Sequence, residues 1–321
     1  MKILLTGAAG FVGSHAAERL LALGHQVVGL DNFDPYYDPA IKRRNVEAAR
    51  AKYPQAYELI EGDFGAPALL DKVLGAGCDA VIHLAAQAGV RPSLEDPLKY
   101  ERVNVTNLLR LLEALRQHGP RKLVAASSSS VYGNVTPAPF REDAPCAQPQ
   151  SPYGASKRAG EIYLGTYARL YGINTVVVRP FTVYGPRQRP DMAIAAFARK
   201  ILLGEELTLF GDGSSARDYT FVEDIVAGLV GALEAEIGFG IYNLGGDRPV
   251  ELRELVAALE AATGKRARVK HAPMQAGDVE RTCADLTRAR RDLGYAPKVS
   301  LEEGLRRTVA WVKEELAREG A

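Results

Sequence analysis

Cysteine, methionine and tryptophan are scarce in this 321-residue sequence, which contains three, three and one of them respectively. Cys78, Cys146 and Cys283 lie far apart, and no Cys-x-x-Cys pair or Cys/His spacing typical of zinc sites is present. An odd number of cysteines also argues against a disulfide framework. We therefore expect no metal site, and thiols that stay reduced, as they do in the cytoplasm.

Long apolar runs and an excess of charge are also missing. No run reaches the ~18 residues of a transmembrane helix, and a strand-like run already begins at residue 2, where a signal peptide would start. Forty Lys and Arg residues against 39 Asp and Glu residues give a net charge of +1. This balance argues against nucleic-acid or anionic-membrane partners. We expect a cytoplasmic protein that binds neither.

Short apolar runs alternate with longer amphipathic stretches in the first half of the chain. Strands are predicted over residues 2–6, 26–30, 57–61, 80–84, 122–127 and 174–179. Helices are predicted over residues 13–23, 105–117 and 152–171, each with a glycine at or near its end, as helix ends commonly have. Continuous Val/Ile/Leu strands that alternate with helices indicate an α/β fold with a doubly wound parallel sheet.

The rhythm changes after about residue 180, where a segment rich in Pro, Gly and Arg follows. Beyond it the pattern predicts helices over 192–203, 251–263 and 301–318, and short strands over 207–210 and 241–244. We expect residues 1–180 to form one domain with return segments near 215–245. A smaller, discontinuous C-terminal domain is then expected mainly from residues 181–321.

The first predicted strand continues into a glycine-rich turn, in which Gly7, Gly10 and Gly13 form G-x-x-G-x-x-G before a helix. Such glycines permit a tight turn and let the helix N-terminus approach a pyrophosphate. Asp31 ends the second strand eighteen residues after Gly13, where an acid bonds an adenosine ribose. An acid there repels a 2′-phosphate, so the pattern favours NAD over NADP. The alternative is an ordinary glycine-rich turn before a helix.

Three further positions suit a cofactor less specifically. Asp63 follows the third strand and either reaches the adenine edge or caps a helix. Residues 83–86 end the fourth strand with small side chains, which suit close passage of a cofactor and equally suit simple strand–helix packing. Asn104 lies inside a predicted helix, where asparagine is unfavourable, and this indicates a positional role.

Tyr153 and Lys157 are four residues apart and so lie on the same face of a predicted helix. An ammonium group near a phenol lowers the pKa of the phenol, and a positively charged nicotinamide acts in the same direction. The resulting phenolate is a general base for alcohol oxidation. The spacing is common by chance, and an exposed helix pair is the alternative. Serines 127–130 follow the fifth strand and either relay a proton or form a turn.

The sequence resembles the extended short-chain dehydrogenase/reductase family and, within it, the nucleotide-sugar 4-epimerases, over nearly the whole chain. The segments that carry the resemblance are TGAAGFVG at 6–13, LDNF at 30–33, GDF at 62–64, HLAA at 83–86, SSSSVYG at 127–133, YGASK at 153–157, RPFTVYGP at 179–186 and GDGSSARDYTFVEDI at 211–225.

This resemblance implies a Rossmann domain that keeps NAD bound throughout turnover. The implied cofactor contacts are Gly7, Gly10, Phe11, Val12, Gly13, Asp31, Asn32, Asp63, Phe64, Leu84, Ala85, Ala86, Gln87, Asn104, Tyr153, Lys157 and Pro180. Tyr153 is the implied base, Lys157 its partner and Ser128 the catalytic hydroxyl. The implied reaction is oxidation and re-reduction at C4 of a UDP-sugar. The resemblance also implies a homodimer formed through residues 105–117 and 152–171.

Two serines bear on the type of reaction. Related dehydratases and decarboxylases of the family carry carboxylates at the positions of Ser129 and Ser130, so the resemblance favours simple epimerisation. Within the epimerases, NFDPYYDPAIKRRN at 32–45, AAQAGVRPS at 85–93, RQRPDMA at 187–193 and PMQAGDV at 273–279 resemble UDP-glucuronate 4-epimerases.

A glucuronate carboxylate needs hydrogen-bond donors, and the candidates are Ser129, Ser130, Thr182 and Arg189. Donors that hold the carboxylate away from the 4-keto group would suppress loss of CO2 from the β-keto acid. Either Arg187 or Arg189 is expected to face the substrate. The alternative for each is a solvated charge on a loop.

Positions farther along the chain concern the nucleotide. The resemblance places Arg217 on the pyrophosphate and Asp278 near the uridine ribose. UDP-glucose 4-epimerases usually have an arginine at the position of Gln275, and this departure puts more weight on Arg217. We interpret Tyr36 and Tyr37 as loop packing outside the site.

Three alternatives to a UDP-glucuronate 4-epimerase remain open. They are a UDP-glucose/UDP-galactose (or N-acetylated) epimerase, a UDP-glucuronate decarboxylase, and a nucleotide-sensing binding protein without catalysis. Intact Tyr153, Lys157 and Ser128 argue against the last, because a sensor needs no tuned phenol.

Overall fold

A parallel sheet forms the centre of the computed structural model, which describes residues 1–120, 122–134, 136–273 and 281–320. The strand order is β10-β6-β5-β4-β1-β2-β3, and each neighbouring pair is parallel. The strands are β1 (Lys2–Thr6), β2 (Gln26–Asp31), β3 (Tyr57–Glu61), β4 (Ala80–His83), β5 (Lys122–Ala126), β6 (Asn174–Pro180) and β10 (Phe239–Leu244). The predicted doubly wound parallel sheet is confirmed.

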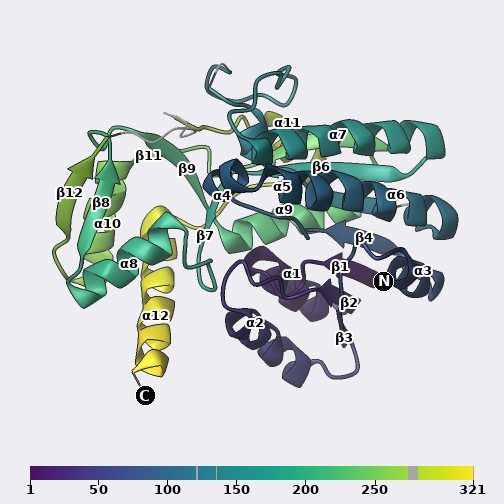
Figure 1. Cartoon of the computed structure of the whole chain (residues 1–321), viewed down its shortest axis with the longest axis horizontal. Helices are drawn as coiled ribbons and strands as arrows, with labels where there is room; N and C mark the ends of the chain where they lie inside the picture. The colour runs from purple at the N-terminus through teal and green to yellow at the C-terminus, as the bar shows by residue number, and fades with distance from the viewer. Residues whose placement is uncertain (121, 135, 274–280, 321) are drawn as a thin grey trace.

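Helices cover both faces of this sheet (Figure 1). One face carries α1 (Phe11–Ala22), α2 (Pro39–Lys52) and α9 (Val222–Glu234). The other carries α3 (Pro67–Gly75), α4 (Val90–Glu95), α5 (Pro97–Glu101), the π-helix η1 (Arg102–Thr106), α6 (Asn107–His118) and α7 (Pro152–Tyr171).

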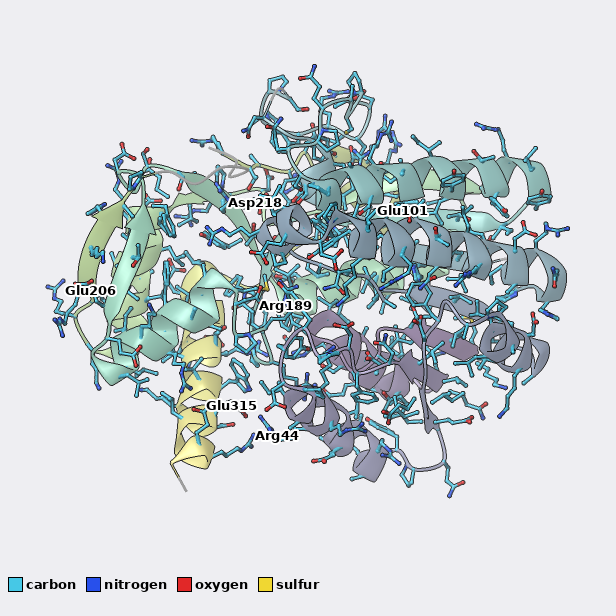
Figure 2. All side chains as sticks on the ribbon, viewed as in Figure 1. Arg44, Glu101, Arg189, Glu206, Asp218 and Glu315 are labelled. Atoms are coloured by element: carbon cyan, nitrogen blue, oxygen red, sulfur yellow. The ribbon has the colours of Figure 1, made fainter. Side chains whose placement is uncertain are left out.

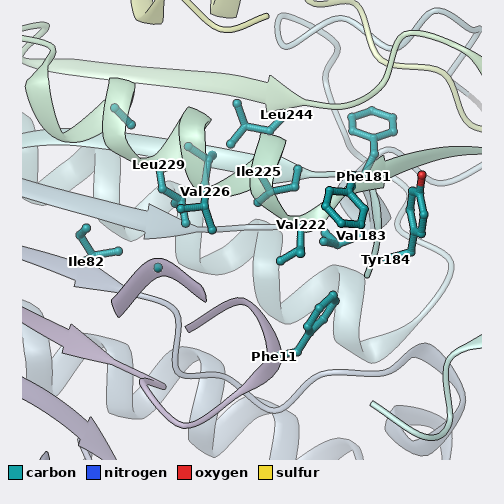
Figure 3. Close-up of a cluster of buried hydrophobic side chains, with 14 of the residues drawn as sticks. Phe11, Ile82, Phe181, Val183, Tyr184, Val222, Ile225, Val226, Leu229 and Leu244 are labelled. Atoms are coloured by element: carbon teal, nitrogen blue, oxygen red, sulfur yellow. The ribbon is translucent and has the colours of Figure 1, made fainter. Parts of the chain in front are cut away.

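Alternate strand residues point to opposite faces, and this explains the continuous apolar runs. In β1, Ile3 and Leu5 join the cluster that includes α1, α2 and α9, while Leu4 joins the cluster under α3, α6 and α7. In β6, Val176 and Val177 divide between the two clusters in the same way. Figure 3 shows the first cluster, in which side chains of α9 pack toward the strands and toward Phe11 of α1.

The direction of the strand order reverses between β1 and β4. From β1 the chain proceeds outward through β2 to β3, and then returns to β4 on the other side of β1. Loops that leave the carboxyl ends of β1 and β4 therefore separate, and open α/β sheets bind ligands in the crevice so formed. The glycine-rich turn follows β1 at this point.

Most of the chain beyond β6 forms a lobe at one end of the sheet, at the left of Figure 1. Its short strands form the sheets β11-β9-β7 and β12-β8. The elements are β7 (Thr182–Tyr184), α8 (Ala193–Leu203), β8 (Glu206–Phe210), β9 (Ala216–Phe221), β11 (Pro249–Glu251), α10 (Leu252–Thr263), β12 (Arg268–Ala272) and α12 (Leu301–Glu319). In contrast, α11 (Thr287–Leu293) packs on α9 and β10 of the main sheet. β10 returns to the main sheet, as predicted for residues 241–244.

The sequence pattern did not predict α2 and misplaced the start of α6. In α2 only Lys42, Asn45, Val46 and Ala49 are buried, so its apolar stripe is too narrow to recognise. The predicted helix 105–117 begins instead at Asn107, after a π-helical turn. Among the described residues, none of the helices is both long and apolar enough for a membrane span.

Candidate active site

A cavity of about 250 Å³ opens where the strand order reverses, beside the loops after β1, β2, β3 and β4. Predicted cofactor contacts that line it are Gly7, Gly10, Phe11, Val12, Gly13, Asp31, Asn32, Asp63, Phe64, Leu84, Ala85, Ala86 and Gln87. The remaining predicted contacts, Asn104, Tyr153, Lys157 and Pro180, are not part of this lining. The wall also contains residues that the sequence did not indicate, chiefly Asp34, Tyr36, Tyr37 and Lys42.

The glycines of the turn are required by close backbone contacts. Gly7 has a φ of +73°, and a Cβ there would lie 2.7 Å from the nitrogen of Ala85. A Cβ on Gly13 would lie 1.9 Å from the carbonyl oxygen of Gly7. At Gly10, the N-cap of α1, the only neighbour within 4 Å is that same oxygen at 3.3 Å. The N-terminus of α1 is thus packed tightly against the turn, and its N–H groups suit a pyrophosphate.

Asp31 and Tyr37 give this wall the chemistry of a ribose site. The Asp31 carboxylate accepts hydrogen bonds from the N–H groups of Ala9 at 3.0 Å and Phe33 at 2.9 Å, which fix its position. The Tyr37 hydroxyl is buried and has no hydrogen-bond partner among the described residues. Because buried polar groups are normally hydrogen-bonded, this orphaned hydroxyl beside a carboxylate fits a ligand with hydroxyl groups. The residues present therefore fit a dinucleotide.

The interpretation of Tyr36 and Tyr37 as loop packing outside the site is wrong, because both side chains line the cavity. Lys42 lies next to them, with its Nζ 4.8 Å from the centre of the Tyr37 ring and 2.8 Å from the carbonyl oxygen of Asp34. The signal that could have identified the two tyrosines is the run of tyrosines and acids shortly after Asp31.

Asn104 and Asp63 hold loops in place. The Asn104 Oδ1 accepts from the N–H of Gln87 at 2.8 Å, and its Nδ2 donates to Ser156 Oγ at 3.0 Å. This amide therefore connects the loop after β4 to α7, in line with the positional role indicated by the sequence. Asp63 Oδ1 accepts from the N–H of Gly65 at 2.7 Å, a turn contact, while the residue also lines the cavity.

The start of α7 brings Tyr153 and Lys157 to the carboxyl end of β5. Ser151 caps this helix, and its side chain accepts a hydrogen bond from the N–H of Gly154 at 3.1 Å. Lys157 Nζ donates to the carbonyl oxygen of Ala126 at 2.8 Å. The Ser128 hydroxyl donates to Ser130 Oγ at 3.2 Å, and it lies near enough to the Tyr153 phenol to act against the rise of the phenol pKa. The structure thus gathers the tyrosine, the lysine and the serine that the sequence selected.

The prediction that the phenol pKa is lowered is wrong for the protein without a cofactor. Burial raises the pKa of Tyr153, although hydrogen bonding to Ser128 and the charge of Arg189 act to lower it. Burial also lowers the pKa of Lys157 to about 8, against the opposing charge of Glu161. Sequence spacing reveals the nearby charge but not the desolvation, which dominates here.

Arg189, and not Arg187, faces the cavity. Its side chain is 20% exposed and binds Asp191 through Nε and Nη2, both at 3.0 Å. Arg187 binds Glu18 at 2.7 Å and lines a separate groove beside α12. Figure 2 places Arg189 between the central layers and the lobe at the left.

The other predicted substrate contacts lie after the carboxyl ends of β5 and β6 and at the amino end of β9. Ser129 and Ser130 begin the 3-10 helix η2 (Ser129–Val131), and Thr182 begins β7. Arg217 lies in β9, where its Nη1 donates to the carbonyl oxygen of Ala216 at 3.1 Å. The prediction for Asp278 concerns a position outside the described residues.

A parallel sheet with a glycine-rich turn at its switch point, with a half-buried tyrosine and a buried lysine of one helix beside it, defines a dinucleotide-dependent enzyme. A sequence profile of the NAD dependent epimerase/dehydratase family matches residues 3–245, and the chain belongs to this family. UDP-glucuronate 4-epimerase of Thermodesulfobacterium geofontis is 41% identical over 315 residues, which cover 98% of this chain and 96% of the relative. UDP-glucuronate 4-epimerase 5 of Arabidopsis thaliana is 42% identical over 330 residues, covering 97% and 75%.

Solved structures of similar fold include two kinds of epimerase. UDP-glucuronic acid 4-epimerase from Bacillus cereus, in complex with UDP-glucuronic acid and NAD, superposes with a TM-score of 0.91 at 37% identity. The match covers 98% of this chain and all (100%) of that one. UDP-glucose 4-epimerase from Thermotoga maritima, solved with UDP-glucose, has a TM-score of 0.90 at 33% identity, with coverage of 98% and 100%.

Proposed function

We propose that the protein is an NAD-dependent UDP-sugar 4-epimerase that interconverts UDP-glucuronate and UDP-galacturonate. The observation that carries the choice of sugar is the position of Arg189, a largely buried cation between the cofactor cavity and Tyr153. The serines at 129 and 130 supply neutral donors where elimination of water would need a carboxylate. The names of the relatives given above point to UDP-glucuronate or UDP-glucose as their substrates. The same oxidation and re-reduction at C4 epimerises either sugar.

The residues around Tyr153 divide the reaction between them. NAD, when bound, supplies the hydride acceptor and donor. Tyr153 takes the proton of the C4 hydroxyl, and Ser128 shares a hydrogen bond with the phenol. The Lys157 ammonium stabilises the phenolate that forms, and its bond to Ala126 keeps it at the end of β5. Tyr153 would return its proton to the C4 oxygen as a bound cofactor supplied hydride to the opposite face of the 4-keto sugar, which gives the epimer.

Binding is divided between the two parts of the chain. Residues 1–180, with the return segments near 215–245, hold NAD, and residues 181–321 mainly hold the nucleotide sugar. In the cofactor cavity we add Tyr37 and Lys42 to the predicted contacts, since they stand beside Asp31. Arg217 contacts the pyrophosphate and Asp278 the uridine ribose. Ser129, Ser130, Thr182 and Arg189 surround the sugar carboxylate.

Proton NMR of the products tests this function directly. UDP-glucuronate and UDP-glucose are incubated separately with the purified protein, without added NAD. We expect conversion of UDP-glucuronate to UDP-galacturonate, with UDP-glucose unchanged. Conversion of UDP-glucose alone would keep Tyr153 and Ser128 in their roles but remove Arg189 from its role. A pentose product would identify a decarboxylase, and no conversion of either sugar would contradict the proposed activity.

The assembly we propose is a homodimer formed through α6 and α7. Large apolar side chains are exposed beside these helices, among them Leu98 at 78%, Ile162 at 57% and Leu170 at 66%. Contiguous exposed apolar residues mark interaction surfaces. Replacing Ile162 and Leu170 together by Glu is expected to give a monomer in analytical ultracentrifugation. Leu203→Glu, at an exposed position on α8, is the control and keeps the dimer. A monomeric wild type would contradict the proposal.

The compartment we propose is the cytoplasm. Cys78, Cys146 and Cys283 are all free thiols in the structure. Burial raises the pKa of all three, so they are held mainly as unreactive thiols at neutral pH. Such thiols persist in a reducing compartment.

A further inference from the structure

A buried ion pair lies next to the residues proposed for catalysis. Glu161 is in α7, one turn after Lys157, and Arg179 is in β6. The carboxylate and guanidinium bind side by side, with Nε to Oε1 at 2.7 Å and Nη2 to Oε2 at 2.8 Å. Their side chains are 0% and 1% exposed, respectively. A pair removed so completely from water is costly to form unless further hydrogen bonds satisfy it.

Glu161 satisfies two more donors. Its Oε1 accepts from the hydroxyl of Ser127 at 2.6 Å, and its Oε2 accepts from Nη1 of Arg158 at 2.9 Å. Arg179 in turn lies 4.7 Å from the centre of the Tyr132 ring, and Tyr132 donates to Asn243 of β10 at 2.7 Å. One carboxylate therefore links α7 to the ends of β5 and β6, and through them to β10.

Residues 126–128 connect the hydrogen bonds of Glu161 to the groups proposed for catalysis. Ala126 accepts the hydrogen bond of Lys157, Ser127 is held by Glu161, and Ser128 contacts the Tyr153 phenol. Displacement of Ser127 would therefore move the partners of both Lys157 and Tyr153. We propose that Glu161 is a positioning residue of the epimerase reaction, which holds residues 126–128 against α7 so that Ser128, Lys157 and Tyr153 meet. This inference rests on the proposed function.

The charges around Lys157 give this role a measurable signature. Burial lowers the pKa of Lys157 to about 8, and Glu161 is the charge that opposes this shift. Burial and the charge of Lys157 lower the pKa of His83 to about 3, so that ring is neutral near pH 7. Without the Glu161 charge, the cations Arg158 and Arg179 would lose the carboxylate that they share. The ammonium of Lys157 would then lose its proton at a lower pH.

The first test replaces the carboxylate by an amide of the same shape. In Glu161→Gln, an NH2 group faces two of the four donors that Glu161 now accepts. We expect a Tm lower by about 5–10 °C, because a buried cation loses its partner. We also expect kcat to fall about 10- to 100-fold through misplacement of the reacting groups. The alkaline limb of the kcat–pH profile is expected to move to lower pH.

A second variant separates positioning from stability. Glu161→Met combined with Arg179→Met replaces the pair by apolar chains of similar length, a change that is often neutral or stabilising. We expect the Tm to recover while kcat stays low, because Ser127 still lacks its acceptor and Lys157 its counter-charge. The KM for UDP-glucuronate is expected to stay within about twofold of wild type, because side chains that are at most 1% exposed do not contact the substrate.

The outcomes are distinct. Recovery of kcat and of the alkaline limb together with the Tm in the double variant would mean that the pair is only structural, and would overturn the inference. An unchanged kcat and alkaline limb in Glu161→Gln would also overturn the inference. If the double variant stays unstable, the result with Glu161→Gln alone decides whether the inference holds. The control is Glu303→Gln on α12, where Glu303 forms an exposed ion pair with Arg306 at the i,i+3 spacing that Arg158 and Glu161 also have, and it should change neither kcat nor the alkaline limb. Wild type in the same assay tests the proposed function separately, and the variants are assayed on whichever UDP-sugar it converts.

Discussion

Tyr153→Phe is expected to lower kcat for UDP-glucuronate about 10²- to 10⁴-fold, the range typical of loss of a general acid–base group. The phenol is the group of this site that can take the C4 hydroxyl proton, since burial and Lys157 give His83 a pKa of about 3. Phenylalanine keeps the ring, which lies 6.1 Å from the ring of Tyr100 in an edge-on contact. The fold and KM should therefore change little, and the loss should fall on kcat.

Steady-state kinetics with NAD content measured on the same sample checks this expectation. Tyr167→Phe is a matched control, because it removes a phenol from the same helix. The hydroxyl of Tyr167 binds Glu113 and not the catalytic serine. That variant should keep wild-type kcat. A Tyr153→Phe enzyme with kcat near wild type would mean that another group takes the proton, and Ser128 would be the first to test.

The positive charge of the cofactor also affects the pKa of this phenol. In the protein alone, burial raises the pKa of Tyr153, and Arg189 and Ser128 only partly oppose this. A positive nicotinamide placed nearby favours the phenolate further. A bound cofactor would thus act together with Arg189 and Ser128 against the effect of burial on this pKa.

The sequence predicted those features that depend on local pattern. Buried parallel strands need continuous apolar runs, so β1, β2 and β6 were recognised almost to the residue. The glycine-rich turn follows from close backbone contacts that a side chain would block, Asp31 from its place at the end of the second strand, and Tyr153 and Lys157 from helical spacing. Each of these signals lies within one or two adjacent elements.

Features that depend on distant packing escaped prediction. Glu161 and Arg179 pair across eighteen residues, and nothing in their neighbourhoods marks two charges as fully buried. The π-helical turn around Asn104, whose amide binds the loop at Gln87, was predicted only as ordinary helix. Tyr37 lines the cavity only because the loop after β2 folds over it. Tertiary contacts decide all three.

Gly13→Ala is expected to remove most of the bound NAD and to destabilise the fold. The added Cβ would lie 1.9 Å from the oxygen and 2.8 Å from the carbonyl carbon of Gly7, both backbone atoms that cannot rotate away. Overpacking of this kind costs about 1–3 kcal/mol, and the same strain would displace the N–H groups at the start of α1 that we propose bind the pyrophosphate. If that strain falls on the bound state, NAD affinity drops roughly 5- to 150-fold.

Gly10→Ala separates the two effects, because the two glycines differ in what surrounds them. A Cβ on Gly10 has one neighbour, the Gly7 oxygen at 3.3 Å, so the fold itself should lose less than about 1 kcal/mol. The residue nevertheless lines the cavity at the N-cap of α1, where the backbone approaches the pyrophosphate. Gly10→Ala should therefore lose NAD with a nearly unchanged Tm, while Gly13→Ala loses NAD and also has a lower Tm.

The control is Gly75→Ala, whose Cβ meets only a His118 ring nitrogen at 4.0 Å, and it should change neither NAD content nor Tm. NAD released on denaturation and thermal unfolding measure the two quantities, and wild-type NAD content in both cavity variants would place the cofactor elsewhere.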